Sequence, residues 1–143
     1  MTGSRFPVVI YHNPECGTSR NTLALIRATG AEPEIIDYLQ AGWTRPHLLG
    51  LFAAAGVTPR EALREKEAAK LAPALLNAAA SDDAILAAMI ANPVLVQRPF
   101  VASPKGVRLC RPKSEAVLDL MDRGLAADFV KEDGQVVPAS PKA

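Results

Sequence analysis

Cys16 is the residue of this sequence best suited to chemistry, because it lies where a short apolar strand meets a helix. The apolar run 6–11 predicts a buried strand, which Pro14 and Gly17 interrupt. Apolar residues at helical spacing follow over 22–29, so Cys16 stands at or just before a helix N-terminus. Unpaired N–H groups and the helix dipole there lower the pKa of a thiol and favour a bound anion. We therefore expect this one turn to supply both a nucleophilic thiolate and a binding site for an oxyanion.

A free cysteine also has a structural interpretation, as a small apolar side chain in a core. A cysteine of that kind would sit within an apolar run. The neighbours of Cys16 are instead asparagine, glutamate, glycine, threonine, serine and arginine. These polar surroundings favour the reactive interpretation over the structural one.

The spacing around Cys16 narrows the chemistry further. Position 19 is Ser, so the motif is Cys-x-x-Ser and not the Cys-x-x-Cys dithiol of a self-contained redox protein. Any disulfide step therefore needs a second thiol from elsewhere.

Composition excludes several classes of partner. A net charge of +1 over 143 residues gives no reason to expect a nucleic-acid partner. No apolar run is as long as a membrane span, and two histidines and two cysteines at these spacings match no zinc pattern. The distant cysteines and the lack of a signal peptide indicate a reducing compartment, so we expect a cytoplasmic protein without a bound cofactor or metal.

The predicted order of elements is that of a thioredoxin-type fold with helices inserted between its halves. The first two strands and the helix between them form a parallel βαβ unit, and a turn over 103–106 makes the last two strands a hairpin. Good helix formers fill the middle of the chain, with Thr44, Thr58 and Ser81 as N-caps. The expected strands are 6–11, 34–38, 100–102 and 107–110, and the expected later helices are 45–55, 59–64, 72–80, 82–91 and 114–121.

We therefore expect a single α/β domain over 1–130, with a thioredoxin-like mixed four-stranded sheet flanked by helices. The helical insertion between its two halves covers about 44–93. From Val130 onward, charged residues, Gly and Pro indicate a loosely held segment, which predicts a flexible C-terminal tail over 131–143.

Three arginines stand where a mixed sheet could bring them near Cys16: Arg64, Arg98 and Arg111. The planar guanidinium stays charged and binds two oxygens of an oxyanion together, although a single arginine is more often a solvated surface residue. Arg98 precedes Pro99 at the start of a strand that faces the nucleophile turn. Thioredoxin-type folds place a cis proline there, so Pro99 is the expected cis proline.

Three segments carry a family resemblance: IYHNPECGTSRNT at 10–22, QRP at 97–99 and GVRLCRP at 106–112. Together they closely resemble the glutaredoxin-coupled arsenate reductases, the thioredoxin-fold class of arsenical resistance enzymes. The resemblance extends from residue 8 to about residue 125, and its first and last motifs are highly specific in combination.

The resemblance implies a role for each matching residue. Cys16 corresponds to the nucleophile of the family, and Arg64, Arg98 and Arg111 correspond to its oxyanion ligands. The sequence around Arg64 departs from the usual pattern of the family, so Arg60 is an alternative third arginine. Cys110 lies within a predicted strand and is expected to be a small core residue.

Two neighbours of Cys16 are candidates for tuning its pKa. An imidazolium at His12 would stabilise the thiolate, or its ring would simply satisfy nearby backbone groups. The hydroxyl of Ser19 would bond the thiolate, or Ser19 would be an ordinary first-turn helix residue. The backbone N–H groups of Gly17, Thr18 and Ser19 are expected to hold oxygens of the bound anion.

The resemblance implies reduction of arsenate to arsenite through a thiol–arsenate adduct on Cys16. Glutathione and glutaredoxin are the expected partners, with glutathione as a co-substrate that resolves the adduct. Members of the same fold family also include regulatory proteins that bind RNA polymerase, and a glutathione-dependent thiol reductase is a further alternative. In those regulatory proteins the oxyanion arginines are incomplete, so retention of Arg98 and Arg111 favours the enzyme.

Overall fold

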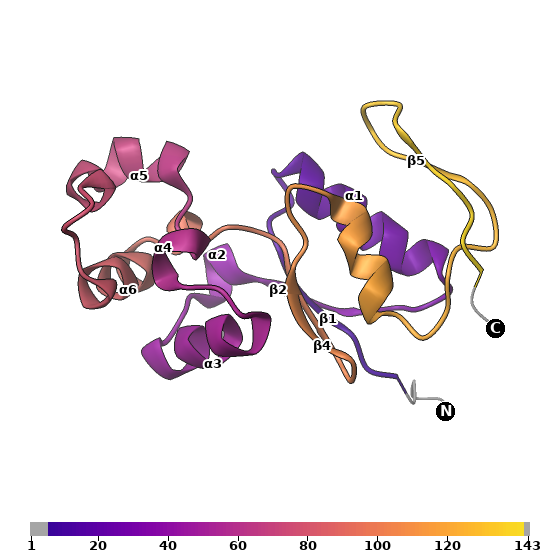
Figure 1. Cartoon of the computed structure of the whole chain (residues 1–143), viewed down its shortest axis with the longest axis horizontal. Coiled ribbons are helices and arrows are strands. Elements are labelled where there is room, and N and C mark those ends of the chain that lie inside the picture. Colours follow the sequence, from indigo (N-terminus) through magenta and orange to yellow (C-terminus); the bar gives the residue numbers. More distant parts are fainter. Residues whose placement is uncertain (1–5, 142–143) are drawn as a thin grey trace. The chain divides into compact units, whose positions relative to one another are not determined.

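The computed structural model describes residues 6–141 and divides them into two compact units (Figure 1). The strand unit contains the described residues up to Asp37 and from Arg98 onward, and the helical unit spans Tyr38–Gln97. The helical unit thus extends beyond the 44–93 expected for an insertion.

The strand unit is built on a mixed four-stranded sheet with the order β2-β1-β3-β4. Its strands are β1 (Val9–His12), β2 (Glu34–Asp37), β3 (Phe100–Ser103) and β4 (Gly106–Leu109). β1 pairs parallel with β2 and antiparallel with β3, and β3 and β4 form the expected antiparallel hairpin. This arrangement confirms the predicted α/β fold with a thioredoxin-like mixed sheet flanked by helices.

Two helices of the strand unit pack against each other beside the sheet, α1 (Gly17–Ala28) and the 3-10 helix η3 (Ser114–Leu120) (Figure 1). The apolar spacing in α1 buries Leu25 and Ile26 completely. They share one core cluster with Ile10 and Val101 from the sheet. This packing fixes the start of α1, and with it Cys16, at the end of β1.

The C-terminal segment contains a two-stranded hairpin that the sequence analysis did not predict, formed by β5 (Phe129–Val130) and β6 (Val136–Val137). Lys131 follows β5, and its Nζ lies 2.6 Å from a carboxylate oxygen of Glu115 in η3. The Lys131 side chain is only 8% exposed. A buried charge needs a close partner, so this ion pair ties the hairpin to η3.

The helical unit contains seven short helices: α2 (Tyr38–Ala41), α3 (Arg45–Ala55), α4 (Pro59–Ala62), α5 (Glu65–Leu71), η1 (Pro73–Leu76), α6 (Asp82–Ala91) and η2 (Pro93–Leu95). The three predicted N-caps are confirmed, because the side chains of Thr44, Thr58 and Ser81 each accept a backbone N–H from the first helical turn.

The middle of the helical unit differs most from the prediction. The expected helix 59–64 ends early, because Leu63 is extended and pairs with Val96 in an isolated bridge. The expected helix 72–80 is only a 3-10 turn, and α5 precedes it instead. Pro73 lacks an N–H and clashes with a preceding carbonyl, so it ends α5 and prevents one continuous helix. Among residues 6–141 no helix is long and apolar enough to cross a membrane.

Candidate active site

Cys16 occupies the N-cap position of α1, as the sequence predicts. Its own N–H donates to the carbonyl of Asn13 at 3.0 Å, and the side-chain Oδ1 of Asn13 accepts the N–H of Glu15 at 2.9 Å. Asn13 therefore folds the chain into the turn that presents Cys16. The N–H groups at the start of a helix have no partner within the helix, so the turn offers donors to an anion beside the sulfur.

Sheet pairing brings two of the predicted arginines together. Phe100 of β3 pairs with Leu109 of β4, and continuing this register places Arg98 opposite Arg111. Arg111 Nη1 lies 3.6 Å from the Cys16 sulfur and 3.2 Å from the carbonyl oxygen of Arg98. Arg98 is buried, so its positive charge lies in a partly desolvated setting beside the nucleophile.

The peptide bond between Arg98 and Pro99 is cis, and so is the bond between Arg111 and Pro112. The first lies at the position where the sequence analysis expects a cis proline. The second was not singled out from the sequence.

The surroundings of Cys16 lower the pKa of its thiol. Burial acts in the opposite direction and raises the pKa, but hydrogen bonds from the backbone N–H of Ser19 and from the side chains of Arg98 and Arg111 outweigh it. The charge of Arg98 adds to this effect. A lowered pKa favours the thiolate, which is the form of a cysteine that acts as a nucleophile.

His12 and Ser19 form a buried pair beneath the nucleophile turn. The His12 Nδ1 lies 2.7 Å from the Ser19 hydroxyl oxygen, which also accepts the N–H of Asn13 at 3.1 Å. Burial lowers the pKa of His12, and Arg20 and Arg27 lower it further against the opposing effect of Asp37. A neutral imidazole is thereby favoured, so the geometry gives His12 a role in holding Ser19 and the turn.

The remaining arginine candidates both lie in the helical unit. Arg60 donates to the backbone carbonyls of Leu75, Asn77 and Ala80, so its guanidinium serves to hold the 75–80 segment. Arg64 lies 2.6 Å from a carboxylate oxygen of Glu67 and is half-buried. Which of the two is the third arginine stays a prediction.

The second cysteine is a core residue of the strand unit. Cys110 is completely buried in the cluster that contains Ile10 and Val101. Burial raises the pKa of its thiol to about 12, with a smaller contribution from Asp119 and an opposing one from Arg108. The pKa values of the two thiols are therefore shifted in opposite directions, downward for Cys16 and upward for Cys110.

This contrast predicts selective alkylation. At neutral pH, iodoacetamide should modify Cys16 faster than Cys110 by more than about tenfold, because the thiolate is the reacting form. Peptide mass spectrometry over a range of pH values measures both rates. Equal rates, or a Cys16 midpoint at or above the unperturbed thiol value of about 8.5, would contradict the assignment.

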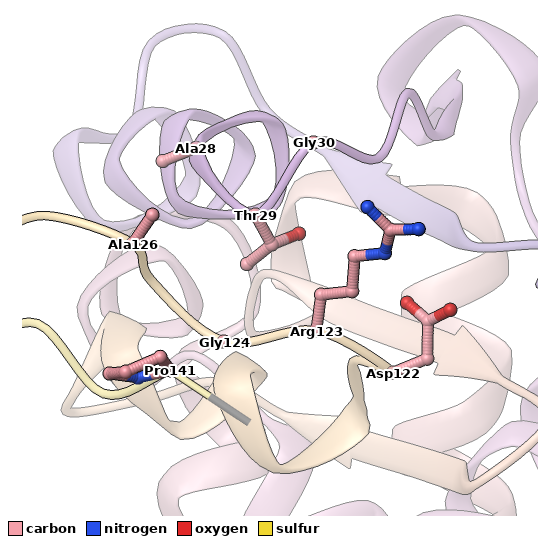
Figure 2. Close-up of a pocket in the computed structure, with 8 residues that line it drawn as sticks. All are labelled: Ala28, Thr29, Gly30, Asp122, Arg123, Gly124, Ala126 and Pro141. Atoms are coloured by element: carbon pink, nitrogen blue, oxygen red, sulfur yellow. The ribbon is translucent and has the colours of Figure 1, made fainter. Parts of the chain in front are cut away.

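A hollow of about 550 Å³ lies at the opposite end of α1 from Cys16 (Figure 2). It is lined by Ala28, Thr29, Gly30, Asp122, Arg123, Gly124, Ala126 and Pro141. The lining contains none of the residues predicted for the site. The candidate active site is therefore defined by Cys16 and its arginines and not by this hollow.

Sequence reasoning gave no role to two residues that lie near the nucleophile turn. Asn13 was quoted in the motif without a role, although an Asn before Pro is a known signal for a turn of this kind. Glu132 contacts Arg20 from the C-terminal hairpin. No local pattern could reveal that contact, because the two residues are 112 positions apart.

Comparison with known proteins agrees with this geometry. Residues 11–118 match the family described as ArsC. Over 130 residues the chain is 55% identical to "Arsenate reductase ArsI2" of Synechocystis sp., with 91% of this chain and 92% of that protein covered. It is 49% identical over 130 residues to "Arsenate reductase" of Rhizobium meliloti, with the same shares covered, 91% and 92%.

A solved structure shares the fold as well. The "Arsenate reductase from Vibrio cholerae" superposes with a TM-score of 0.75 at 38% identity, covering 82% of this chain and 100% of that one. These similarities confirm the resemblance seen in the sequence motifs, and the chain belongs to the ArsC family.

Proposed function

We propose that this protein is an arsenate reductase, an oxidoreductase that converts arsenate to arsenite. The observation that carries the proposal is the thiol of Cys16 at the N-terminus of α1, with Arg111 Nη1 at 3.6 Å and a lowered pKa. The names of the similar proteins from Synechocystis sp. and Rhizobium meliloti support arsenate as the substrate.

Binding of arsenate is assigned to the groups around the sulfur. Arg98 and Arg111 neutralise the oxyanion, and the backbone N–H groups at 17–19 donate to its remaining oxygens. Arg64 is the third ligand, a role that rests on the family resemblance. No resident cofactor or metal is needed, because the electrons come from thiols.

The first chemical step forms a bond between the Cys16 sulfur and arsenic. The thiolate attacks As(V), and one As–O bond breaks so that the oxygen leaves as water after protonation. Glutathione then supplies the second sulfur. The glutathione thiolate attacks the Cys16 sulfur, so that the S–S bond forms while the S–As bond breaks. The electron pair of the broken bond stays on arsenic, which is reduced from As(V) to As(III) and departs as arsenite.

The route by which the free Cys16 thiolate is regenerated follows from the lack of a second thiol in the motif. Because position 19 is Ser, the disulfide formed on Cys16 involves glutathione. A glutaredoxin thiolate attacks the glutathione sulfur and releases Cys16 as a thiolate. The cycle belongs in the cytoplasm, where the glutathione pool keeps thiols reduced.

The direct test is arsenite formation by the purified protein with glutathione and glutaredoxin, beside the Cys16→Ser variant. Turnover that depends on Cys16 supports the proposal. Reduction of glutathione mixed disulfides without any arsenite formation would favour a glutathione-dependent thiol reductase. Binding to RNA polymerase without either reaction would favour the regulatory members of the fold family.

The choice of reductant gives a separate prediction. Glutathione with glutaredoxin should sustain many turnovers, whereas thioredoxin alone should not, because Cys16 has no neighbouring resolving thiol. Ser19→Ala should lower the rate by less than about tenfold, since the hydroxyl only holds the turn through single hydrogen bonds. Full turnover with thioredoxin alone would reject the glutathione route and would indicate that Cys110 acts as a resolving thiol.

A further inference from the structure

Arg20 joins three separate segments around the nucleophile turn. It lies one helical turn after Cys16, and its Nη1 donates to the carbonyl of Pro14 at 2.8 Å. Its Nε and Nη2 donate to the two carboxylate oxygens of Glu132 at 2.9 and 3.0 Å. The N–H of Glu132 donates in turn to the side chain of Asn21 at 3.1 Å. The C-terminal hairpin is thus tied to the first turns of α1 at two points.

The hairpin presents Glu132 from an anchored position. The preceding residue, Lys131, is buried and pairs with Glu115 of η3, and its Nζ also donates to Gln135 at 2.8 Å. Backbone hydrogen bonds close the turn, from the N–H of Lys131 to Gln135 and from the N–H of Gly134 to Lys131. Glu132 is therefore held by its neighbours at the place where it meets Arg20.

The ion pair lies close to Gly17, the residue directly after Cys16. A Cβ placed on Gly17 would lie 3.7 Å from Arg20 Nη2 and 3.8 Å from Glu132 Oε1. Pro14, on the other side of Cys16, is held by the same guanidinium. The pair thus lies beside the chain on both sides of Cys16, and through Arg20 it is hydrogen-bonded to Pro14.

A second pair at the other end of α1 provides a comparison. Arg27 and Glu32 also form a two-pronged pair, with side chains 48% and 69% exposed, against 44% and 51% for Arg20 and Glu132. Exposed pairs of this kind contribute little to stability. The difference is that Arg27 and Glu32 are five positions apart, whereas Glu132 comes from a distant segment and its partner also holds Pro14.

We propose that Glu132 is a positioning residue for Cys16: through Arg20 it holds the carbonyl of Pro14 and so fixes the turn that presents the sulfur. The effect on turnover rests on the proposed function, whereas the effect on the reactivity of the thiol does not. The Glu132 side chain belongs to a segment that forms no part of the family motifs around Cys16.

The substitution Glu132→Gln distinguishes two ways in which Glu132 could act on Cys16, because they change the pKa of the thiol in opposite directions. If Glu132 acted only through its negative charge, removing that charge would lower the pKa of Cys16. If it positions the turn, its loss loosens the contacts of Cys16 with Ser19 N–H and the arginines, and the pKa rises. The charged and titratable groups near the turn are His12, Glu15, Arg20, Arg98, Arg111 and Glu132.

The experiment compares Glu132→Gln and Arg20→Lys with wild type. Iodoacetamide labelling over pH gives the Cys16 midpoint, and arsenite formation gives kcat/KM. Arg20→Lys keeps the positive charge but loses the two-pronged geometry, so both variants should raise the midpoint and lower kcat/KM by about three- to tenfold. The double variant should be no worse than the more damaged single variant, because the two residues act as one unit.

The matched controls are Arg27→Lys and Glu32→Gln, which should leave both measurements at the wild-type values. Wild-type behaviour of Arg20→Lys, a lowered Cys16 midpoint in Glu132→Gln, or equal effects of the control pair would each overturn the proposal. If the wild-type protein makes no arsenite, the proposed function fails while the labelling measurement still decides this inference. If the wild type is active and the midpoint does not move, only this inference fails.

Discussion

Cys16→Ser is expected to abolish arsenite production, with kcat/KM lowered by roughly a thousandfold or more. A serine hydroxyl stays protonated where the thiol is ionised, so the arginines and the α1 N-terminus no longer act on an anionic nucleophile. The measurement is arsenite formed with glutathione and glutaredoxin at saturating concentrations of both.

The matched control for this substitution is Cys110→Ala. Cys110 is completely buried in the core and its thiol has a raised pKa, so removing the thiol should leave the rate within about threefold of wild type. Residual turnover in Cys16→Ser together with loss of turnover in Cys110→Ala would assign the nucleophile to the other cysteine.

Arg98→Ala and Arg111→Ala should each lower kcat/KM for arsenate by about ten- to a hundredfold. The loss of a hydrogen bond between a charged donor and a desolvated anion costs roughly 1.5 to 3 kcal/mol. The Lys variants should fall between Ala and wild type, because Lys keeps the charge and loses the two-pronged fit. Phosphate and sulfate should compete weakly with arsenate in wild type, and less in the Ala variants.

Arg108→Ala is the control for these two arginines. Arg108 lies on β4 near Arg111, but its side chain is about half exposed and pairs with Asp119 at 2.7 Å. Its removal should leave kcat/KM unchanged, which separates a local anion site from a general effect of positive charge. Turnover like wild type in both Arg98→Ala and Arg111→Ala would show that arsenate binds elsewhere.

Local sequence patterns were sufficient to predict the part of the candidate site next to Cys16. The break at Pro14 and Gly17 placed Cys16 at the helix start, and the structure has it at the N-cap. The turn before β4 gave the β3–β4 hairpin, and the pairing of that hairpin is what places Arg98 opposite Arg111. Both results follow from interactions between residues close in sequence.

The features missed from the sequence depend on contacts between distant residues. The hairpin β5–β6 has strands of two residues each, which carry no readable periodicity. Its place is set by the pairs of Lys131 with Glu115 and of Glu132 with Arg20. A segment rich in charge, Gly and Pro was therefore interpreted as a tail, although Lys131 pairs with η3 and Glu132 pairs with α1. How mobile residues 131–143 are stays a prediction.

The contact between His12 and Ser19 was missed for a related reason. The sequence left two interpretations open for each residue: that it tunes the thiol directly, or that His12 satisfies nearby backbone groups and Ser19 is an ordinary first-turn helix residue. In the structure the His12 ring contacts the Ser19 hydroxyl, and burial lowers its pKa. Burial of a polar residue at a strand end depends on what packs over it, which neighbouring residues in the sequence do not specify.

The measurement that tests the central claim most directly is the mass of the protein after a single turnover without glutaredoxin. Equimolar arsenate and excess glutathione should yield one arsenite per protein and one glutathione attached to Cys16, with Cys110 unmodified. A disulfide between Cys16 and Cys110, or arsenite formation with glutathione attached to neither cysteine, would contradict the account.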